Sequence, residues 1–338
     1  MEGHGSPLNI MDIELLWERA RIIRMVRSFF DQQQYLETDT PLLSPDLIPE
    51  SCLEVFETLK VQPRGSIKDN EPCWLIPSPE IWMKKLIAQH KVNLYQICKC
   101  FRNGESSGRL HSPEFTMLEY YTMGADYLDS LKITEELFSF LLSKSPAFVN
   151  DSSALKPPFM RISMEEAFRR WAGFDLYRAA EEPGALEKKA RSLGLVPSPG
   201  LRETELYDLI FIHKVEPNLP RDAPLVLMDY PAFVPCLARK SPGGKTSERW
   251  ELYINGIELA NCYSEETRPH EVKQFFENEK DEKEKHCLIR HKVDEDYWKL
   301  FDKGNNFPPC SGVALGLDRL IMALLGRSSI DAVLPFPN

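Results

Sequence analysis

Apolar residues recur at steps of three and four positions between Asp12 and about Gln33. The positions that keep this spacing are Ile13, Leu16, Trp17, Ala20, Ile23, Val26 and Phe30. Such a repeat places its members along one side of a helix. The pattern therefore predicts a long amphipathic helix over residues 12–33 that packs through one face.

Short strand-like runs rich in β-branched and aromatic residues follow this helix. They are YLETDTPLLSPD at 35–46, VFETLKV at 55–61, CWLIP at 73–77, LYQICKCF at 94–101 and EFTMLEYY at 114–121. Their links are too short for parallel crossovers. The runs predict a mainly antiparallel sheet, and a helix over 79–90 is inserted among them.

The middle third of the chain has the periodicity of helices instead. Helical patterns cover 126–142, 163–173, 185–194 and 203–215, which predicts a mainly helical insertion over about 126–222. Strand patterns return in 225–231 and in a hairpin around Asn255-Gly256, and they are followed by a charged helix over 270–286 and a strand plus helix over 311–326. Helices inserted into an antiparallel sheet indicate the α+β class.

Composition changes this picture little. The 338 residues are 43% hydrophobic and 27% charged, as in globular proteins, and the net charge of −10 argues against general binding to polyanions. Eight cysteines without a Cys-x-x-Cys pair suggest reduced thiols in a cytoplasmic protein. We expect a flexible tail over 1–11, one domain over 12–338, and neither a signal peptide nor a membrane span.

The Asn255-Gly256 turn suggests a metal site. A two-residue turn fixes the strand register. It pairs Ile254 with Ile257, Tyr253 with Glu258, and Glu251 with Ala260. Glu251 and Glu258 then share a face as diagonal neighbours, roughly 7 to 8 Å apart, and can converge on Mg²⁺ shared with a polyphosphate. The alternative is two solvated glutamates on an exposed face.

A second cluster lies in FRNGESSGRLHSPEFTMLEYY, at 101–121. Alternation places Arg102 at the end of one strand and Phe115, Met117, Glu119 and Tyr121 on one face of the next. An arginine beside a carboxylate and aromatic rings suggests a charged planar ligand. The alternative is a structural ion pair between Arg102 and Glu119.

These segments together resemble the class II aminoacyl-tRNA synthetases. The segment at Pro41 is similar to their motif 1, FRN…RLHSPEF to motif 2 and SGVALGLDRL to motif 3, and the resemblance extends from about residue 12 to 335. Long matches such as HSPEFTMLEYY and NGIELANCYSEE resemble lysyl-tRNA synthetases. Closer still is the paralogous elongation factor P–(R)-β-lysine ligase family. The resemblance implies an antiparallel sheet flanked by helices.

The resemblance also implies roles for individual residues. Arg102 and Arg319 would be the catalytic arginines, on the α- and γ-phosphates of ATP. The remaining ATP contacts would be Asn103, Glu105, Arg109, His111 and Phe115, and Mg²⁺ would bind Glu251 and Glu258. The amino acid would meet Arg102 and Ala314, with its α-amino group at Glu119, its side chain along Tyr121 and Asn261, and its ε-ammonium at Glu80 and Glu265.

Two features depart from the family pattern. The motif 2 loop is one residue longer than expected and has Gly104 where a glutamate is usual, with Glu105 next to it. Regular alternation would also put Asn261 and Glu265 on the face opposite Glu258. The assignment therefore predicts a bulge or strand end near 260–262.

The resemblance favours modification of a protein over charging of tRNA. Only 40 residues precede Pro41, fewer than the about 50 that an independent domain needs, so we expect no anticodon-binding domain and no tRNA substrate. In this family an alanine at the position of Ala314 accompanies (R)-β-lysine rather than lysine. We expect ATP-dependent activation of (R)-β-lysine, or lysine, as an aminoacyl-adenylate and its transfer to a lysine ε-amine of elongation factor P, by a homodimer.

Alternatives remain at this stage. One is a truncated lysyl-tRNA synthetase-like enzyme that charges tRNA or another small acceptor. The other is a non-catalytic regulator that senses lysine or ATP. The loop ARKSPGGKTSER at 238–249 is either a docking site for an acidic partner, through basic residues that include Arg249, or a solvated loop.

Overall fold

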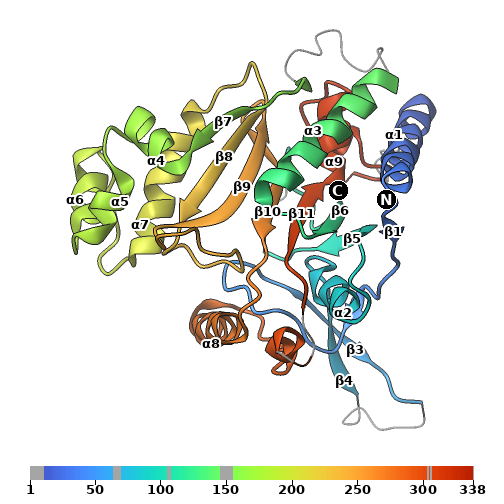
Figure 1. Ribbon diagram of the computed structural model, residues 1–338, viewed down its shortest axis with the longest axis horizontal. Helices are drawn as coiled ribbons and strands as arrows, with labels where there is room; N and C mark the ends of the chain where they lie inside the picture. The colour runs from blue at the N-terminus through green and yellow to red at the C-terminus, as the bar shows by residue number, and fades with distance from the viewer. Residues whose placement is uncertain are drawn as a thin grey trace, which may run out of the picture.

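The computed structural model describes residues 11–63, 70–104, 108–144, 155–302, 304 and 307–337 (Figure 1). Its α-helices are α1 (Ile13–Gln32), α2 (Glu80–His90), α3 (Tyr127–Lys144), α4 (Met164–Ala167), α5 (Leu176–Glu181), α6 (Ala185–Ser192), α7 (Glu203–Ile210), α8 (Pro269–His286) and α9 (Leu317–Leu324). Most of the tail predicted over 1–11 lies outside the described residues.

The strands fall into two sheets rather than one. They are β1 (Leu36–Glu37), β2 (Leu43–Ser44), β3 (Phe56–Lys60), β4 (Glu71–Leu75), β5 (Leu94–Phe101), β6 (Glu114–Met123), β7 (Met160–Ser163), β8 (Leu225–Pro231), β9 (Thr246–Ile254), β10 (Ile257–Ser264) and β11 (Cys310–Gly316). The main sheet has the order β1-β5-β6-β11-β10-β9-β8-β7, and β2-β4-β3 form the small one.

The main sheet confirms the antiparallel prediction. All its neighbouring strands are antiparallel except the outermost pairs, β1 with β5 and β7 with β8, which are parallel. The runs at 55–61 and 73–77 were predicted to join this sheet, and that was wrong. They pair with each other as β3 and β4, since Glu57 faces Trp74 across a local antiparallel ladder.

One face of the main sheet is covered by α1, α3 and α9 (Figure 1). The predicted amphipathic helix is α1, and its buried Ile22, Val26 and Phe30 join Leu118 and Trp250 from the strands in the largest apolar core. Because side chains alternate across a strand, the neighbours of these strand residues point to the opposite face. That face is left for polar chemistry.

The helices α4 to α7 surround a second apolar core beyond β7 and β8, at the left in Figure 1. Ser163 caps the N-terminus of α4, and its hydroxyl accepts from the Glu166 amide at 3.2 Å. A π-helical turn over Phe168–Ala172 continues α4, and another over Phe211–Val215 continues α7. By contrast, α3 belongs to the main core.

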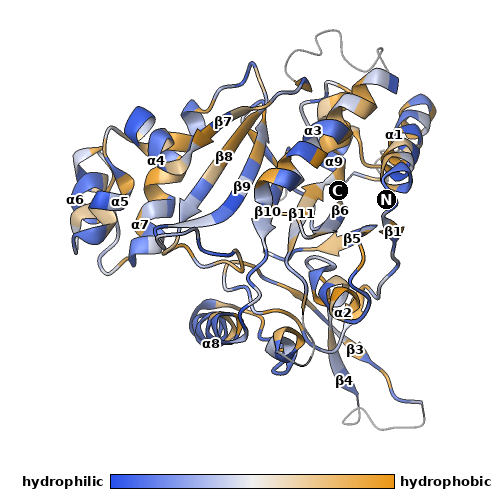
Figure 2. Ribbon diagram, viewed as in Figure 1, coloured by the Kyte–Doolittle hydropathy of each residue, from blue (hydrophilic) through white to orange (hydrophobic). Residues whose placement is uncertain are grey.

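The charged helix α8 lies beside the 3-10 helix Tyr297–Phe301, which in turn contacts α2, and Figure 2 shows that most residues of α8 are hydrophilic. Its buried Val272 and Phe276 belong to a third apolar core, which also contains residues of α2. Within the described ranges, no helix combines the length and apolar character needed to cross a bilayer. These three elements border the uncovered face of the main sheet.

Candidate active site

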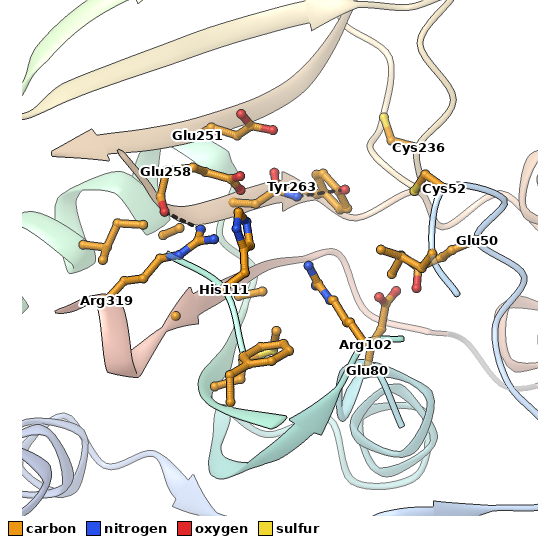
Figure 3. A pocket seen from close by; sticks show the side chains of 18 of the residues that line it. Glu50, Cys52, Glu80, Arg102, His111, Cys236, Glu251, Glu258, Tyr263 and Arg319 are labelled. Carbon is orange, nitrogen blue, oxygen red and sulfur yellow. Dashed lines mark hydrogen bonds between the residues drawn. The ribbon is translucent and has the colours of Figure 1, made fainter. Parts of the chain in front are cut away.

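A cavity of about 460 Å³ opens on this face (Figure 3). Nine residues singled out from the sequence line it together: Glu80, Arg102, His111, Phe115, Glu251, Glu258, Asn261, Ala314 and Arg319. They come from segments as far apart as α2 and α9. The strand order brings them together, because β6, β11, β10 and β9 are consecutive neighbours.

Arg102 is positioned where β5 ends. Its amide donates to the Pro113 carbonyl at 3.0 Å, which closes the β5–β6 hairpin above Cys100 and Phe115. The guanidinium carbon lies 5.2 Å from the centroid of the Phe115 ring, and the side chain points into the cavity (Figure 3). This places a permanent positive charge over an aromatic face, as a charged planar ligand requires.

Arg319 enters the cavity from the first turn of α9. Its Nη1 donates to the Glu258 carbonyl at 2.7 Å and its Nε to the Leu110 carbonyl at 3.2 Å, so the guanidinium is fixed across the cavity from Arg102 (Figure 3). The preceding Asp318 has a structural role instead. It is buried and forms an ion pair with Arg19 of α1 at 2.6 Å.

The hairpin that carries the two glutamates is bulged. Ile254 faces Ile257 and Tyr253 faces Glu258, as predicted, but the register then shifts between Glu258 and Ala260. The predicted pairing of Glu251 with Ala260 is therefore wrong, and Glu251 faces Asn261 instead. The turn fixed only the first two pairs, because one extra residue in β10 displaces every later pair.

This bulge is the irregularity that the assignment required, although it lies just before the predicted 260–262. It turns Asn261 to the face of Glu251 and Glu258. Across the next two strands, Asn261 faces Ala314 and Ala314 faces Glu119. Ala314 thus lies between an amide and a carboxylate on one face, where a single methyl group affects the shape of the cavity.

Glu251 and Glu258 have different surroundings. Glu251 accepts from Arg249 at 2.5 Å and from the Tyr253 hydroxyl at 2.8 Å. Burial, and next the Glu251 carboxylate, raise the pKa of Glu258 to about 7. A cation between two carboxylates would relieve this repulsion.

The donor set fits Mg²⁺ held jointly with a phosphate. Among the described residues, no group of three or more His, Cys, Asp or Glu side chains could enclose a metal ion. Mg²⁺ takes few protein carboxylates and completes its octahedron with water and substrate phosphate. Glu251 and Glu258 would supply the protein share.

A buried lysine that the sequence interpretation missed lies between the two glutamates predicted to receive the ε-ammonium. Of these three residues, Glu80 lines the cavity, whereas Lys84 and Glu265 do not. The Lys84 ammonium, 1% exposed, lies 2.6 Å from Glu80 and 2.6 Å from Glu265. Burial lowers the pKa of Lys84, but Glu265 and Glu80 outweigh this and hold it well above its ordinary value. The two glutamates predicted to receive a substrate ammonium therefore already share one, which leaves the trio a single net negative charge.

Glu119 and Tyr121, which were predicted to contact the amino acid, are buried and are not among the residues that line the cavity. The Tyr121 hydroxyl donates to Glu119 Oε1 at 2.7 Å, whereas Oε2 has no hydrogen-bond partner among the described residues. Burial, and next Glu80, raise the pKa of Glu119 well above its usual range. A buried carboxylate oxygen without a donor suits a cationic group of a ligand.

Two predicted ATP ligands lie outside the cavity. The backbone amide of Asn103 donates to the Glu54 carbonyl at 2.9 Å, so Asn103 is bound to the segment before β3. Arg109 is exposed, and its guanidinium donates to the Ser328 carbonyl at 3.2 and 3.3 Å. Glu105 lies outside the described residues. The sequence placed all three by motif alone, without a geometric argument.

Arg249 lies inside the cavity rather than in a docking loop. Its guanidinium is 4.3 Å from the Tyr230 ring and 5.5 Å from the Tyr263 ring, and it holds Glu251 and Asn261. Strand alternation from Glu251 could have placed it there. Its inclusion in the loop was wrong, because β9 already begins at Thr246.

Comparison with known proteins identifies the family. The family model of class II tRNA synthetases (D, K and N) matches residues 12–338. The chain is 34% identical over 325 residues to "Elongation factor P--(R)-beta-lysine ligase" of Avibacterium paragallinarum, covering 96% of this chain and 95% of that protein. Proteins of the same name match at 34% in Vibrio atlanticus, over 99% of this chain and 98% of that protein, and at 35% in Buchnera aphidicola, over 96% and 95%.

The acidic slot, formed by Glu80, Lys84 and Glu265, has no room for a side chain at Gly312. A Cβ at Gly312 would lie 2.5 Å from Glu265 Oε1 and 2.5 Å from the Tyr121 ring. We expect Gly312→Ala to weaken binding of a long cationic amino acid about fivefold or more, because overpacking typically costs about 1–3 kcal/mol. Titration calorimetry measures the affinity.

Gly124→Ala is the control for this variant. Gly124 has φ of 71° and nothing within 4 Å of an added Cβ, so the change strains the backbone without touching the cavity. It should cost about 1 kcal/mol of stability and leave the affinity unaltered. Equal affinities for wild type and Gly312→Ala would contradict this account of the slot.

Proposed function

The chain belongs to the class II tRNA synthetase family of the D, K and N type, and from this we propose that it activates (R)-β-lysine, or lysine, with ATP and transfers it to a lysine ε-amine of elongation factor P. It is an ATP-dependent aminoacyl ligase. The observation that supports the substrate is one cavity in which Arg102 and Arg319 flank the Glu251–Glu258 pair, beside the acidic slot of Glu80, Lys84 and Glu265.

Formation of the adenylate needs position and charge rather than a protein nucleophile. The amino acid carboxylate attacks the α-phosphorus of ATP, and pyrophosphate leaves. Arg102 would hold the carboxylate against the α-phosphate, and Arg319 would bind the departing phosphates. Mg²⁺ at Glu251 and Glu258 would neutralise charge on the phosphate oxygens.

The slot selects a long cationic amino acid by its net charge. Glu80, Lys84 and Glu265 together carry one unit of negative charge, which an ε-ammonium neutralises. An uncharged side chain would leave that buried charge without a partner, which is costly. The unpartnered Glu119 Oε2 would receive the second amino group.

We also propose a homodimer, supported by an apolar surface beside motif 1. Ile13 and Trp17 on α1 are each 63% exposed, and Leu36 of the edge strand β1 is 55% exposed. Symmetric dimers bury such patches against their own copies. A translation-factor substrate and eight free cysteines favour a cytoplasmic location.

The substrate assignment is tested by mass spectrometry of both acceptors. The enzyme is incubated with ATP, one lysine isomer, elongation factor P and tRNA, and the acceptors are then weighed. We expect (R)-β-lysine to add one aminoacyl group to elongation factor P and none to tRNA. Labelled tRNA with unmodified elongation factor P would refute the assignment.

Ala314 should determine the preferred isomer. We expect Ala314→Gly to lower the ratio of kcat/KM for (R)-β-lysine over α-lysine about tenfold or more, because one methyl group in a packed pocket is worth about 1–3 kcal/mol. ATP–pyrophosphate exchange measures both values. Ala323→Gly, outside the cavity on α9, should cost about 1 kcal/mol of stability and leave the ratio unaltered.

The dimer is tested by sedimentation. The wild type should sediment at about twice the chain mass of 38.9 kDa. Trp17→Glu should sediment as a monomer, because it places a charge in the apolar contact. Ile212→Glu, at an exposed apolar residue of the helical insertion, should leave the dimer intact. A wild type at the monomer mass would exclude the proposal.

A further inference from the structure

One carboxylate in the cavity has no role in formation of the adenylate. Glu50 follows β2 in the segment before β3, is half-buried and lines the cavity. Within the described part of the chain, no hydrogen bond or ion pair engages its carboxylate, although its backbone carbonyl is bound. The transfer step, meanwhile, needs a group that can take a proton from the acceptor ammonium.

The loop that carries Glu50 is held in place by α8. The Ser51 amide donates to Glu279 Oε2 at 2.8 Å, and the Lys283 ammonium donates to the carbonyls of Glu50 at 2.9 Å and Leu53 at 2.5 Å. Glu279 and Lys283 are the buried charged residues of this otherwise hydrophilic helix. Both are committed to this loop, so the Glu50 side chain projects from a fixed backbone.

Glu50 lies on the open side of Arg102. Figure 3 shows Glu50 and Cys52 to the right of Arg102, whereas Arg319 and Glu258 lie to its left. Cys52 is exposed, so this loop borders the mouth of the cavity. An acceptor side chain that entered beside Cys52 towards a carboxylate bound at Arg102 would pass Glu50.

The charged groups around Glu50 suit proton exchange near neutrality. Glu80 faces it from α2, Arg102 from the end of β5, and Glu279 and Lys283 from α8. Burial, and next Glu80, raise the pKa of Glu50 to about 7, against the pull of Arg102 and Lys283. A general base is most effective when its pKa lies near the working pH.

The neighbouring groups are less suited. Although Cys52 as a residue is exposed, desolvation of its sulfur, and next the charge of Glu50, raise the pKa of the thiol to about 11, so this thiol stays protonated. Glu80 is bound to Lys84, and Glu119 is buried and accepts from the Tyr121 hydroxyl. Glu258 lies beside the phosphate-binding arginine.

We propose that Glu50 is the general base of the transfer step, an inference that rests on the proposed function. Its carboxylate takes a proton from the ε-ammonium of the acceptor lysine. The freed nitrogen lone pair forms a bond to the carbonyl carbon of the adenylate. The C–O bond to the phosphate then breaks, AMP leaves with the electron pair, and the nitrogen loses a second proton to that phosphate.

Single-turnover transfer tests this role. Enzyme loaded with adenylate is mixed with elongation factor P at several pH values, and the product is followed by mass spectrometry. Glu50→Gln should keep ATP–pyrophosphate exchange within about threefold of wild type and lose about 100-fold or more in the transfer rate at pH 7. The exposed Glu57→Gln in β3 is the matched control and should behave as wild type.

Three further readouts separate a base from a merely structural residue. The wild-type rate should rise with pH and level off above about 7, whereas the Glu50→Gln rate should keep rising as the free amine becomes more abundant. Hydroxylamine, largely unprotonated near neutral pH, needs no base and should capture the adenylate equally fast on both enzymes. Glu50→Asp should recover part of the rate.

The outcomes distinguish the two proposals. A wild type that forms adenylate but never labels elongation factor P refutes the proposed function, and the role of Glu50 with it. A wild type that labels it, together with an unaltered Glu50→Gln profile, refutes only the role of Glu50. The role of Glu50 alone is also refuted if Glu50→Gln raises KM for the acceptor at unaltered kcat. The same conclusion follows if Glu50→Gln lowers the rates of ATP–pyrophosphate exchange and of transfer equally.

Discussion

The candidate site depends on the register of one antiparallel sheet. Side chains alternate between the faces of a strand, so a shift of one residue moves every later side chain to the opposite face. The bulge between Glu258 and Ala260 applies that shift once, and Asn261 thereby joins Glu251 and Glu258 above the cavity. The other face remains apolar and packs against α1, α3 and α9. One irregular position therefore brings Asn261 to the face that carries the two glutamates.

The second constraint is the burial of charge. Charged groups removed from water must be paired. The structure pairs most of them but leaves one negative charge in the acidic slot without a partner. Arg19 neutralises Asp318 within the core, and Lys84 neutralises one of the two acids in the slot. The remaining negative charge can be balanced by a ligand. The specificity proposed for a cationic amino acid is thus a consequence of incomplete internal compensation.

The helix α8 holds the loop that carries Glu50. Its exposed face carries many charges, but Glu279 and Lys283 are buried and bind the loop that carries Glu50. In the proposed sequence of steps, phosphate binds on the side of Arg319 and Glu258, and the acceptor lysine enters on the side of Glu50 (Figure 3). Arg102 lies between them and would contact the carboxyl group throughout.

The sequence by itself determined the elements, the α+β class and the segments that form the site, because periodicity and turn chemistry are local properties. Arg102 and Arg319, to which the family resemblance assigned the phosphates, both line the cavity. Only the tertiary structure decided which side chains meet. Because of the bulge, Glu251 faces Asn261 and not Ala260. Lys84 pairs with the glutamates predicted to bind a substrate ammonium. Arg249 lies in the cavity and not in a loop, and Arg109 lies at the surface. Each depends on contacts between segments distant in the chain, and no local pattern encodes those distances.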